Sequence, residues 1–179
     1  SDKVQTARYH ISFDDLTVSE NMWQVFDPDQ VLSREPLNMN IDLSAGLTYN
    51  IEWLDVLNVE NEIMIQQFPV ELHDLRIDAF DISGAGASLA ATGAFTFDMT
   101  DLDTFAGMPR PTGVAGATMT GVHALLDNLI ALELLDADEA FGMRMGIGMF
   151  SRDDGNGTLT SSVEIDQAGS VHVNGERVR

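Results

Sequence analysis

The side chains best able to bind a cation are aspartates gathered in two loop-like segments. Asp98, Asp101 and Asp103 fall within six residues of one another, and clustered carboxylates supply the oxygen ligands that calcium prefers. The segment lacks the central glycine and the terminal glutamate of an EF-hand loop. A second run, Asp-Asp-Gly-Asn-Gly at 153–157, has a similar composition, but it lies between apolar stretches and is typical of a hairpin connection. We therefore predict no metal site.

Catalytic side chains are not grouped in any spacing that a known mechanism requires. The small-residue run Gly84–Ser88 lacks the lysine of a phosphate loop and the spacing of a nucleophile elbow, so a turn explains it better. Twenty-nine acidic residues offer no means of selecting one pair for acid–base work. The four histidines are scattered singly, without the spacings of zinc sites: they are His10, His73, His123 and His172. We predict neither catalysis nor a cofactor.

Composition limits the class of protein and its partners. With 179 residues, of which 44% are hydrophobic, the chain is long enough for one packed domain spanning 1–179. The net charge of −20 repels phosphate backbones, which excludes nucleic acid as a partner. Because there is no cysteine, disulfides and thiolate metal sites are excluded as well.

The strongest structural pattern is an unbroken alternation of apolar and polar residues over 37–53. Successive side chains of a strand point to opposite faces, so this segment predicts a sheet with one apolar face and one wet face. Seventeen residues at about 3.3 Å each would span roughly 55 Å, well beyond an ordinary strand. Either one very long strand runs here, or two strands meet near residues 44–46. The apolar positions are Leu37, Met39, Ile41, Leu43, Ala45, Leu47, Tyr49, Ile51 and Trp53.

Further strands are predicted on both sides of this segment. The phase of the alternation slips near Asp14–Asp15, which indicates a bulge or a strand end within 9–18. Residues 70–79 and 87–97 predict a hairpin, with Val70 and Leu72 in one phase and Leu75, Ile77 and Ala79 in the other. The remaining predicted strands are 112–121, 159–165 and 171–173, the last ending at an Asn-Gly turn, together with a short strand at 62–67 inside a linker.

Three helices complete the predicted elements. Ser19 begins a short helix that ends at Asp27–Pro28, and apolar residues at helical spacing predict a longer helix over 122–135. A helix over 137–149 starts at a capping box formed by Asp136 and Glu139, and it carries Phe141, Met145 and Met149 on one stripe. The predicted fold is α+β and strand-dominated: a long, curved antiparallel sheet with one face covered by the C-terminal helix pair.

Several segments together resemble a known family. They are NMWQVFDP at 21–28, LSREP at 32–36, IDLS at 41–44, GAFTFD at 93–98, FAGMPRPTG at 105–113 and VNGER at 173–177. As a set they are similar to the C-terminal part of the alphaproteobacterial domain-of-unknown-function family 2125. The ending of the chain resembles, more loosely, AsmA-like envelope proteins, which build elongated sheets with an apolar face and are associated with lipid handling. Longer members of family 2125 resemble envelope proteins with an N-terminal signal or anchor, so the first resemblance implies a periplasmic or periplasm-facing domain, anchored or processed upstream of Ser1.

The sequence favours a non-enzymatic envelope domain that binds lipid or another apolar ligand along one face of the sheet. The alternative is a structural or assembly module within a protein complex, and a third class is a hydrolase. Ligand identity and oligomeric state stay open. The predicted ligand-binding residues are Leu37, Met39, Ile41, Leu43, Leu47, Tyr49, Ile51, Trp53, Met145 and Met149.

Overall fold

The computed structural model describes residues 3–49 and 70–179, and within these ranges it is a strand-dominated antiparallel sheet accompanied by helices. The fold class predicted from the sequence is confirmed. Ile51, Trp53 and the short strand at 62–67 lie outside the described residues. The strands are β1 (Gln5–Leu16), β2 (Leu37–Tyr49), β3 (Val70–Gly84), β4 (Ala87–Asp98), β5 (Arg110–Thr120), β6 (Arg152–Asp153), β7 (Thr158–Ile165), β8 (Val171–Val173) and β9 (Glu176–Arg177). The helices are α1 (Glu20–Phe26), α3 (Val122–Ala131) and α4 (Ala137–Phe150).

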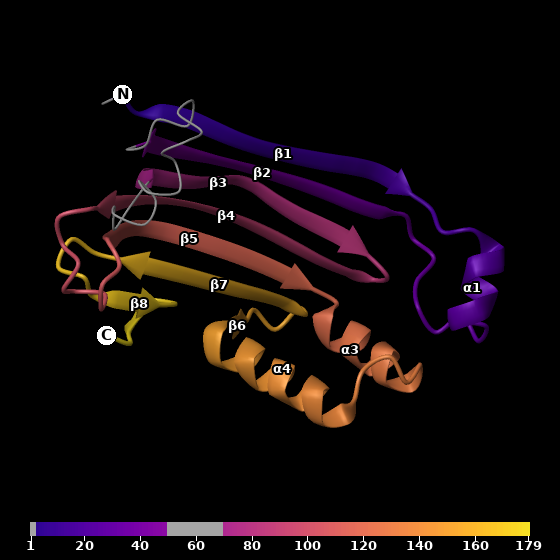
Figure 1. Cartoon of the computed structure of the whole chain (residues 1–179). Coiled ribbons are helices and arrows are strands. Elements are labelled where there is room, and N and C mark those ends of the chain that lie inside the picture. Colours follow the sequence, from indigo (N-terminus) through magenta and orange to yellow (C-terminus); the bar gives the residue numbers. More distant parts are fainter. Residues whose placement is uncertain (1–2, 50–69) are drawn as a thin grey trace.

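The described strands form one open sheet in which each strand pairs with a neighbour close in the chain. The order is β1-β2-β3-β4-β5-β7-β8-β9, and the short β6 pairs with β7 beside β8. Every pairing is antiparallel. The long strands β1 to β5 run side by side and bow gently along their length (Figure 1). Antiparallel neighbours permit tight turns, as between β3 and β4 and between β8 and β9, whereas longer segments that include helices join β1 to β2 and β5 to β6.

Bulges in β3 keep its apolar side chains on one side of the sheet. Leu72 lies opposite Leu47 and Leu75 lies opposite Ala45, although the two β3 residues are three positions apart and their β2 partners only two. The extra residue restores the phase that the sequence pattern loses after Leu72. The two predicted phases of this strand therefore belong to one face.

A second bulge corrects one detail of the predicted phase. Ile77 lies opposite Leu43, whereas Ala79 lies opposite Asp42 on the polar face, and Phe80 then returns to the apolar face opposite Ile41. Ala79 was predicted to share the face of Ile77, and this was wrong because the bulge turns the strand over between them. In β1 the predicted slip is confirmed by a register shift between Phe13 and Leu16.

The predicted turns are confirmed at both hairpins. Ala85 and Gly86 join β3 to β4 with φ of 53° and 83°, and Asn174 and Gly175 join β8 to β9 with φ of 52° and 81°. Positive φ at both central residues gives the turn twist that matches paired strands. The aspartate-rich run at 153–157 connects β6 to β7, as expected of a hairpin connection.

The helix pair lies on the apolar side of the sheet, beside β5 and β7 and not beside β2. The Ser161 hydroxyl, which is on the apolar side of β7, donates to the Phe150 carbonyl at the end of α4. Figure 1 shows α3 and α4 beside β5 and β7. α3 starts directly after β5, so the short connection keeps α3 near β5. β2 lies three strand spacings from β5, about 14 Å, and is therefore far from the start of α3. α3 also ends at Ala131, earlier than predicted, and Glu133 adopts a φ of 57°.

A buried carboxylate organises the connection between α1 and β2. Asp27 is fully buried, and its two oxygens accept the N–H groups of Val31 and Leu32 at 2.8 and 3.0 Å. Arg34 contacts the same carboxylate at 3.0 Å, and its guanidinium lies 4.0 Å from the ring centre of Trp23. Burial alone would raise the pKa of Asp27, but the two N–H groups and Arg34 together hold it below its ordinary value.

We expect Asp27→Ala to lower the midpoint of thermal unfolding by about 5 °C or more, because two buried N–H groups and one guanidinium lose their acceptor. Asp29→Ala is the matched control, since Asp29 is exposed two residues away. Thermal unfolding followed by circular dichroism measures both variants. Equal midpoints would show that the Asp27 contacts do not stabilise this connection.

Candidate functional site

The largest feature of the structure is an apolar face that runs across all the long strands. Its side chains are paired by register from strand to strand: Ile11 with Ile41, Ile41 with Phe80, and Phe80 with Ala91. Most of these side chains are half-buried, and Tyr9 and Ile11 at the β1 edge are exposed. In the described ranges the fully buried apolar residues are limited to Leu32, Leu126, Ala140 and Leu159. We call this surface the apolar face; its main large members are Tyr9, Ile11, Phe13, Leu37, Met39, Ile41, Leu43, Leu47, Tyr49, Val70, Leu72, Leu75, Ile77, Phe80, Ile82, Leu89, Phe95, Phe97, Met119, Leu159, Val163 and Ile165.

The structure places the predicted ligand-binding residues in two separate groups. The β2 members lie on the apolar face and are half-buried, in agreement with the alternating pattern: they are Leu37, Met39, Ile41, Leu43, Leu47 and Tyr49. Met145 and Met149 lie on α4, on the side opposite the buried Ala140, and both are exposed. The methionines therefore do not join the β2 residues in one site.

An apolar pocket of about 320 Å³ lies at one end of the apolar face, where β3 begins and β4 ends. Among the described residues, no charged side chain lines it. The sequence pattern around Asp98–Asp103 indicates only a loop and did not predict this pocket; the phenylalanines, methionines and prolines between 95 and 111 were the available signal. The lining residues are Val70, Leu72, Phe97, Met99, Phe105, Met108, Pro109 and Pro111.

The loop that forms one wall of this pocket is fastened by Arg110. Its guanidinium contacts Asp98 at 2.9 Å and Asp101 at 3.2 Å, and it also donates to the Gln167 carbonyl. Two of the three aspartates that resembled a cation site are therefore paired with one arginine. Within the described part of the chain, no group of three or more histidine or acidic side chains is arranged to hold a metal.

Hydrogen bonds within the loop hold both carboxylates in their charged form. Bonds from the Thr100 hydroxyl and N–H, followed by Arg110, keep the pKa of Asp98 below its ordinary value. Bonds from the Thr104 N–H and hydroxyl, with a smaller effect of Arg110, do the same for the pKa of Asp101. The loop is thus tied to the sheet by contacts that require ionised aspartates.

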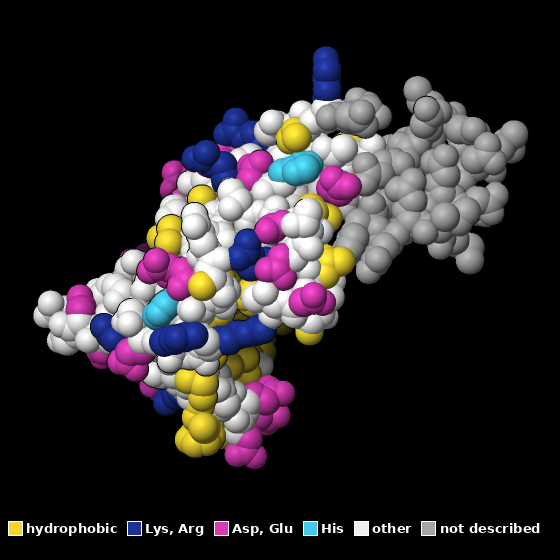
Figure 2. Space-filling model, turned by 90° about the vertical axis from the view of Figure 1, so that its left-hand side faces the viewer, with side chains coloured by type: hydrophobic (Ala, Val, Ile, Leu, Met, Phe, Trp, Pro, Cys, Tyr) yellow, Lys and Arg dark blue, Asp and Glu magenta, His cyan; other side chains and the backbone are white. Residues whose placement is uncertain are grey.

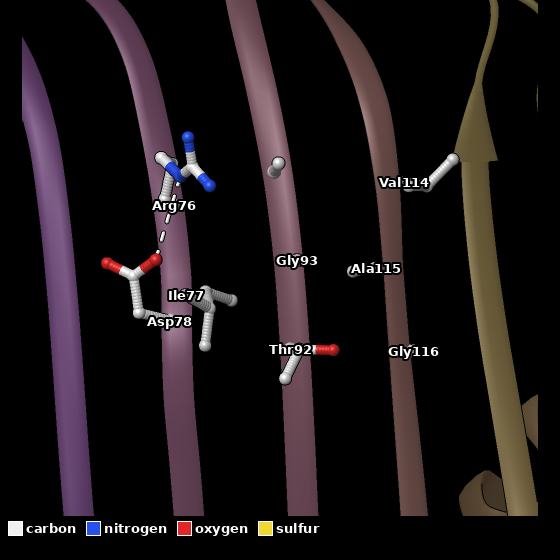
Figure 3. A pocket seen from close by; sticks show the side chains of 9 residues that line it. Arg76, Ile77, Asp78, Thr92, Gly93, Val114, Ala115 and Gly116 are labelled. Carbon is white, nitrogen blue, oxygen red and sulfur yellow. Dashed lines mark ion pairs between the residues drawn. The ribbon is translucent and has the colours of Figure 1, made fainter.

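The opposite face of the sheet is polar and carries only shallow hollows. One of them, about 500 Å³, lies over Thr92, Gly93 and Gly116, where side chains are short (Figure 3). Its charged members, Arg76 and Asp78, contact each other at 3.6 Å. Figure 2 shows acidic and basic side chains interspersed across one end of the molecule, with hydrophobic side chains gathered toward the bottom of the view. We find no arrangement for catalysis in this hollow.

The histidines stay apart from one another. His10 contacts the Asn40 side chain at 3.1 Å and His73 contacts the Thr48 hydroxyl at 2.8 Å. His123 lies in the first turn of α3, and His172 lies on β8 opposite Glu164. These contacts tie neighbouring strands together and do not assemble a nucleophile with a base.

Comparison of the chain with protein-family models, with curated proteins and with solved structures finds no match. The resemblance to the alphaproteobacterial family therefore stays an interpretation of the sequence. Among the helices of the described residues, none is long and apolar enough to span a membrane.

The fastening of the loop predicts an acid-sensitive contribution to stability. Because the folded pKa values of Asp98 and Asp101 are lowered, their contribution is present above the ordinary aspartate pKa of about 3.9 and is lost as the pH falls through the folded values. We expect Arg110→Met to reduce this loss between pH 6 and pH 3, measured as urea unfolding midpoints. Arg76→Met, at an exposed ion pair, is the control; the same effect in both variants would contradict the prediction.

Proposed function

We propose that the protein is a non-enzymatic cell-envelope domain that binds lipid acyl chains along the apolar face. The observation that carries this proposal is the continuity of the face: apolar side chains extend from β1 to β7, small ones across the middle of β4 and β5, and most of the large ones stay half-buried or exposed. Contiguous apolar surface of this kind is typical of a site for an apolar partner.

The two faces of the sheet differ in a way that suits a lipid ligand. On the polar face Arg8 contacts Asp42, and Ser44 donates to Asp78, so polar side chains there satisfy one another. On the apolar face, apolar side chains are still exposed to water. Removing this surface from water would be favourable by about 25 cal/mol per Å². An acyl chain laid along the face would cover this surface without requiring specific polar contacts.

The location in the envelope is supported by the resemblance of the segments at 21–28, 93–98 and 105–113 to a family whose longer members resemble envelope proteins. The net charge of −20 also favours a ligand whose headgroup carries no net negative charge. We therefore include periplasm-facing location and an apolar ligand in one proposal, without a catalytic step.

A charge placed on the apolar face should reduce lipid binding. Ile82 is 40% exposed on this face, and Ile82→Asp should roughly halve the monopalmitoylglycerol retained per chain, because an ionised carboxylate under an acyl chain is strongly unfavourable. Native mass spectrometry counts the retained lipid. Val114 is 55% exposed on the polar face, so Val114→Asp is the matched control and should leave the count unchanged.

Three results would contradict the proposal: no retained lipid in the unmodified chain, the same loss from both substitutions, or a loss from Val114→Asp alone. Near-ultraviolet circular dichroism of each variant separates loss of binding from loss of packing.

An assembly module is the second candidate function, favoured by the outer side of α4. Phe141, Met145 and Met149 are exposed along one stripe, and the space around Gly142 and Gly146 is open. Small residues beside an apolar stripe allow another helix to approach closely, and methionine adapts to irregular partners. The simplest partner is a second copy of the chain.

Self-association through α4 should increase with salt, because screening weakens the repulsion between two copies that each carry a net charge of −20. We expect the dimer fraction in sedimentation velocity to rise between 0.05 and 0.5 M NaCl and to fall with Met145→Glu. Val25→Glu, on the exposed side of α1, is the control. A monomer at all salt concentrations would exclude this mode of assembly.

A further inference from the structure

We infer that the pocket at the end of the apolar face accepts the terminal part of one unbranched acyl chain, about twelve carbons long, from a lipid without net negative charge. This inference rests on the proposed function and makes it specific: it assigns the highest-affinity position and the class of ligand. The pocket belongs to the apolar face through Leu72 and Phe97, whereas Phe105 and Met108 reach it from the loop.

The lining of the pocket determines the chemistry of its occupant. The side chains are aliphatic, aromatic or thioether groups, so a polar or charged group placed inside would lose its hydration without compensation. Two of them, Met99 and Met108, can adjust to a flexible chain. A hydrocarbon segment is the ligand chemistry that loses nothing on entering this pocket.

The volume of the pocket sets the length of the segment. An apolar cavity of about 150 Å³ accepts benzene, which corresponds to about 25 Å³ per carbon. At that ratio a pocket of about 320 Å³ accommodates about twelve carbons. Any longer part of the chain, with its headgroup, would continue outside the pocket, and the β3 residues Leu75 and Ile77 extend the apolar face from there.

Charge near the pocket disfavours an anionic headgroup. The loop carries Asp98, Asp101 and Asp103, and the guanidinium of Arg110 is already shared between the first two. Arg179 lies 4.4 Å from the ring centre of Phe105 and donates to the Thr104 carbonyl, so this second cation is engaged as well. The net charge of −20 adds repulsion at longer range.

A series of monoacylglycerols from eight to eighteen carbons tests the length of the segment by isothermal titration calorimetry. We expect the affinity of the tightest site to rise about fourfold per added methylene up to about twelve carbons, and clearly less per methylene beyond that length. We call the chain length at which this gain falls the break. Leu72→Ala removes three side-chain carbons from the lining, so the break should move to about fifteen carbons. A constant slope through eighteen carbons, or a break that Leu72→Ala does not move, would overturn the assignment of the pocket.

Paired substitutions test whether the tightest lipid site is the pocket. Met108 is 63% exposed at the pocket and Met149 is 67% exposed on α4, so Met108→Asp should weaken the tightest site at least tenfold while Met149→Asp changes it less than about twofold.

Lauric acid, with the same chain and a carboxylate headgroup, should bind more weakly than monolaurin at pH 8. Tighter binding of lauric acid would overturn the inference about the headgroup.

The outcomes also separate this inference from the proposed function. Ile82 lies near the far end of β3, ten residues from Leu72, so Ile82→Asp should lower the total retained lipid without weakening the pocket site. If Ile82→Asp removes lipid but Met108→Asp has no effect, the apolar face binds lipid and the pocket inference is wrong. If no monoacylglycerol binds, the proposed function fails with it.

Discussion

The fold depends on one constraint: every strand must keep its apolar side chains on the same side of the sheet. Strict alternation meets this requirement in β2, but β3 contains more residues than its partner and would turn over without its bulges. The bulges between Leu72 and Leu75 and between Ile77 and Phe80 correct the phase. Because each strand of the sheet is aligned on its neighbours, a loss of phase in β3 would propagate to β4 and β5.

Cross-strand contacts on the apolar face take a large share of the stabilising role that a closed core has in other domains. Pairs such as Ile11 with Ile41 and Ile41 with Phe80 are typically worth a few tenths to about 1 kcal/mol each. The helix pair adds fully buried packing at one end, around Leu126, Ala140 and Leu159. An acyl chain on the remaining face would add stability by mass action, since it would bind the folded sheet and not the unfolded chain.

The acidic side chains contribute to structure as well as to solubility. Asp27 fastens the connection after α1, and Asp98 and Asp101 fasten the loop beside the pocket through Arg110. In all three cases backbone N–H groups or hydroxyls solvate the carboxylate, which explains why oxygen-rich segments that resemble cation sites can serve as turns and loop anchors. Asp153 and Asp154 accept N–H groups within their own turn in the same way.

The sequence by itself determined the elements whose signals are local. The alternation over Leu37–Tyr49, the turns at Gly84–Gly86 and Asn174–Gly175, and the helix at 137–149 follow from side-chain periodicity and backbone preference, which act within a few residues. Only the tertiary structure decided where those elements meet: the register that returns Phe80 to the apolar face, the distance that keeps α3 and α4 from β2, and the pocket formed by Leu72, Phe97 and Met108. These features depend on contacts between residues far apart in the chain, and a local pattern contains no information about the distance between them.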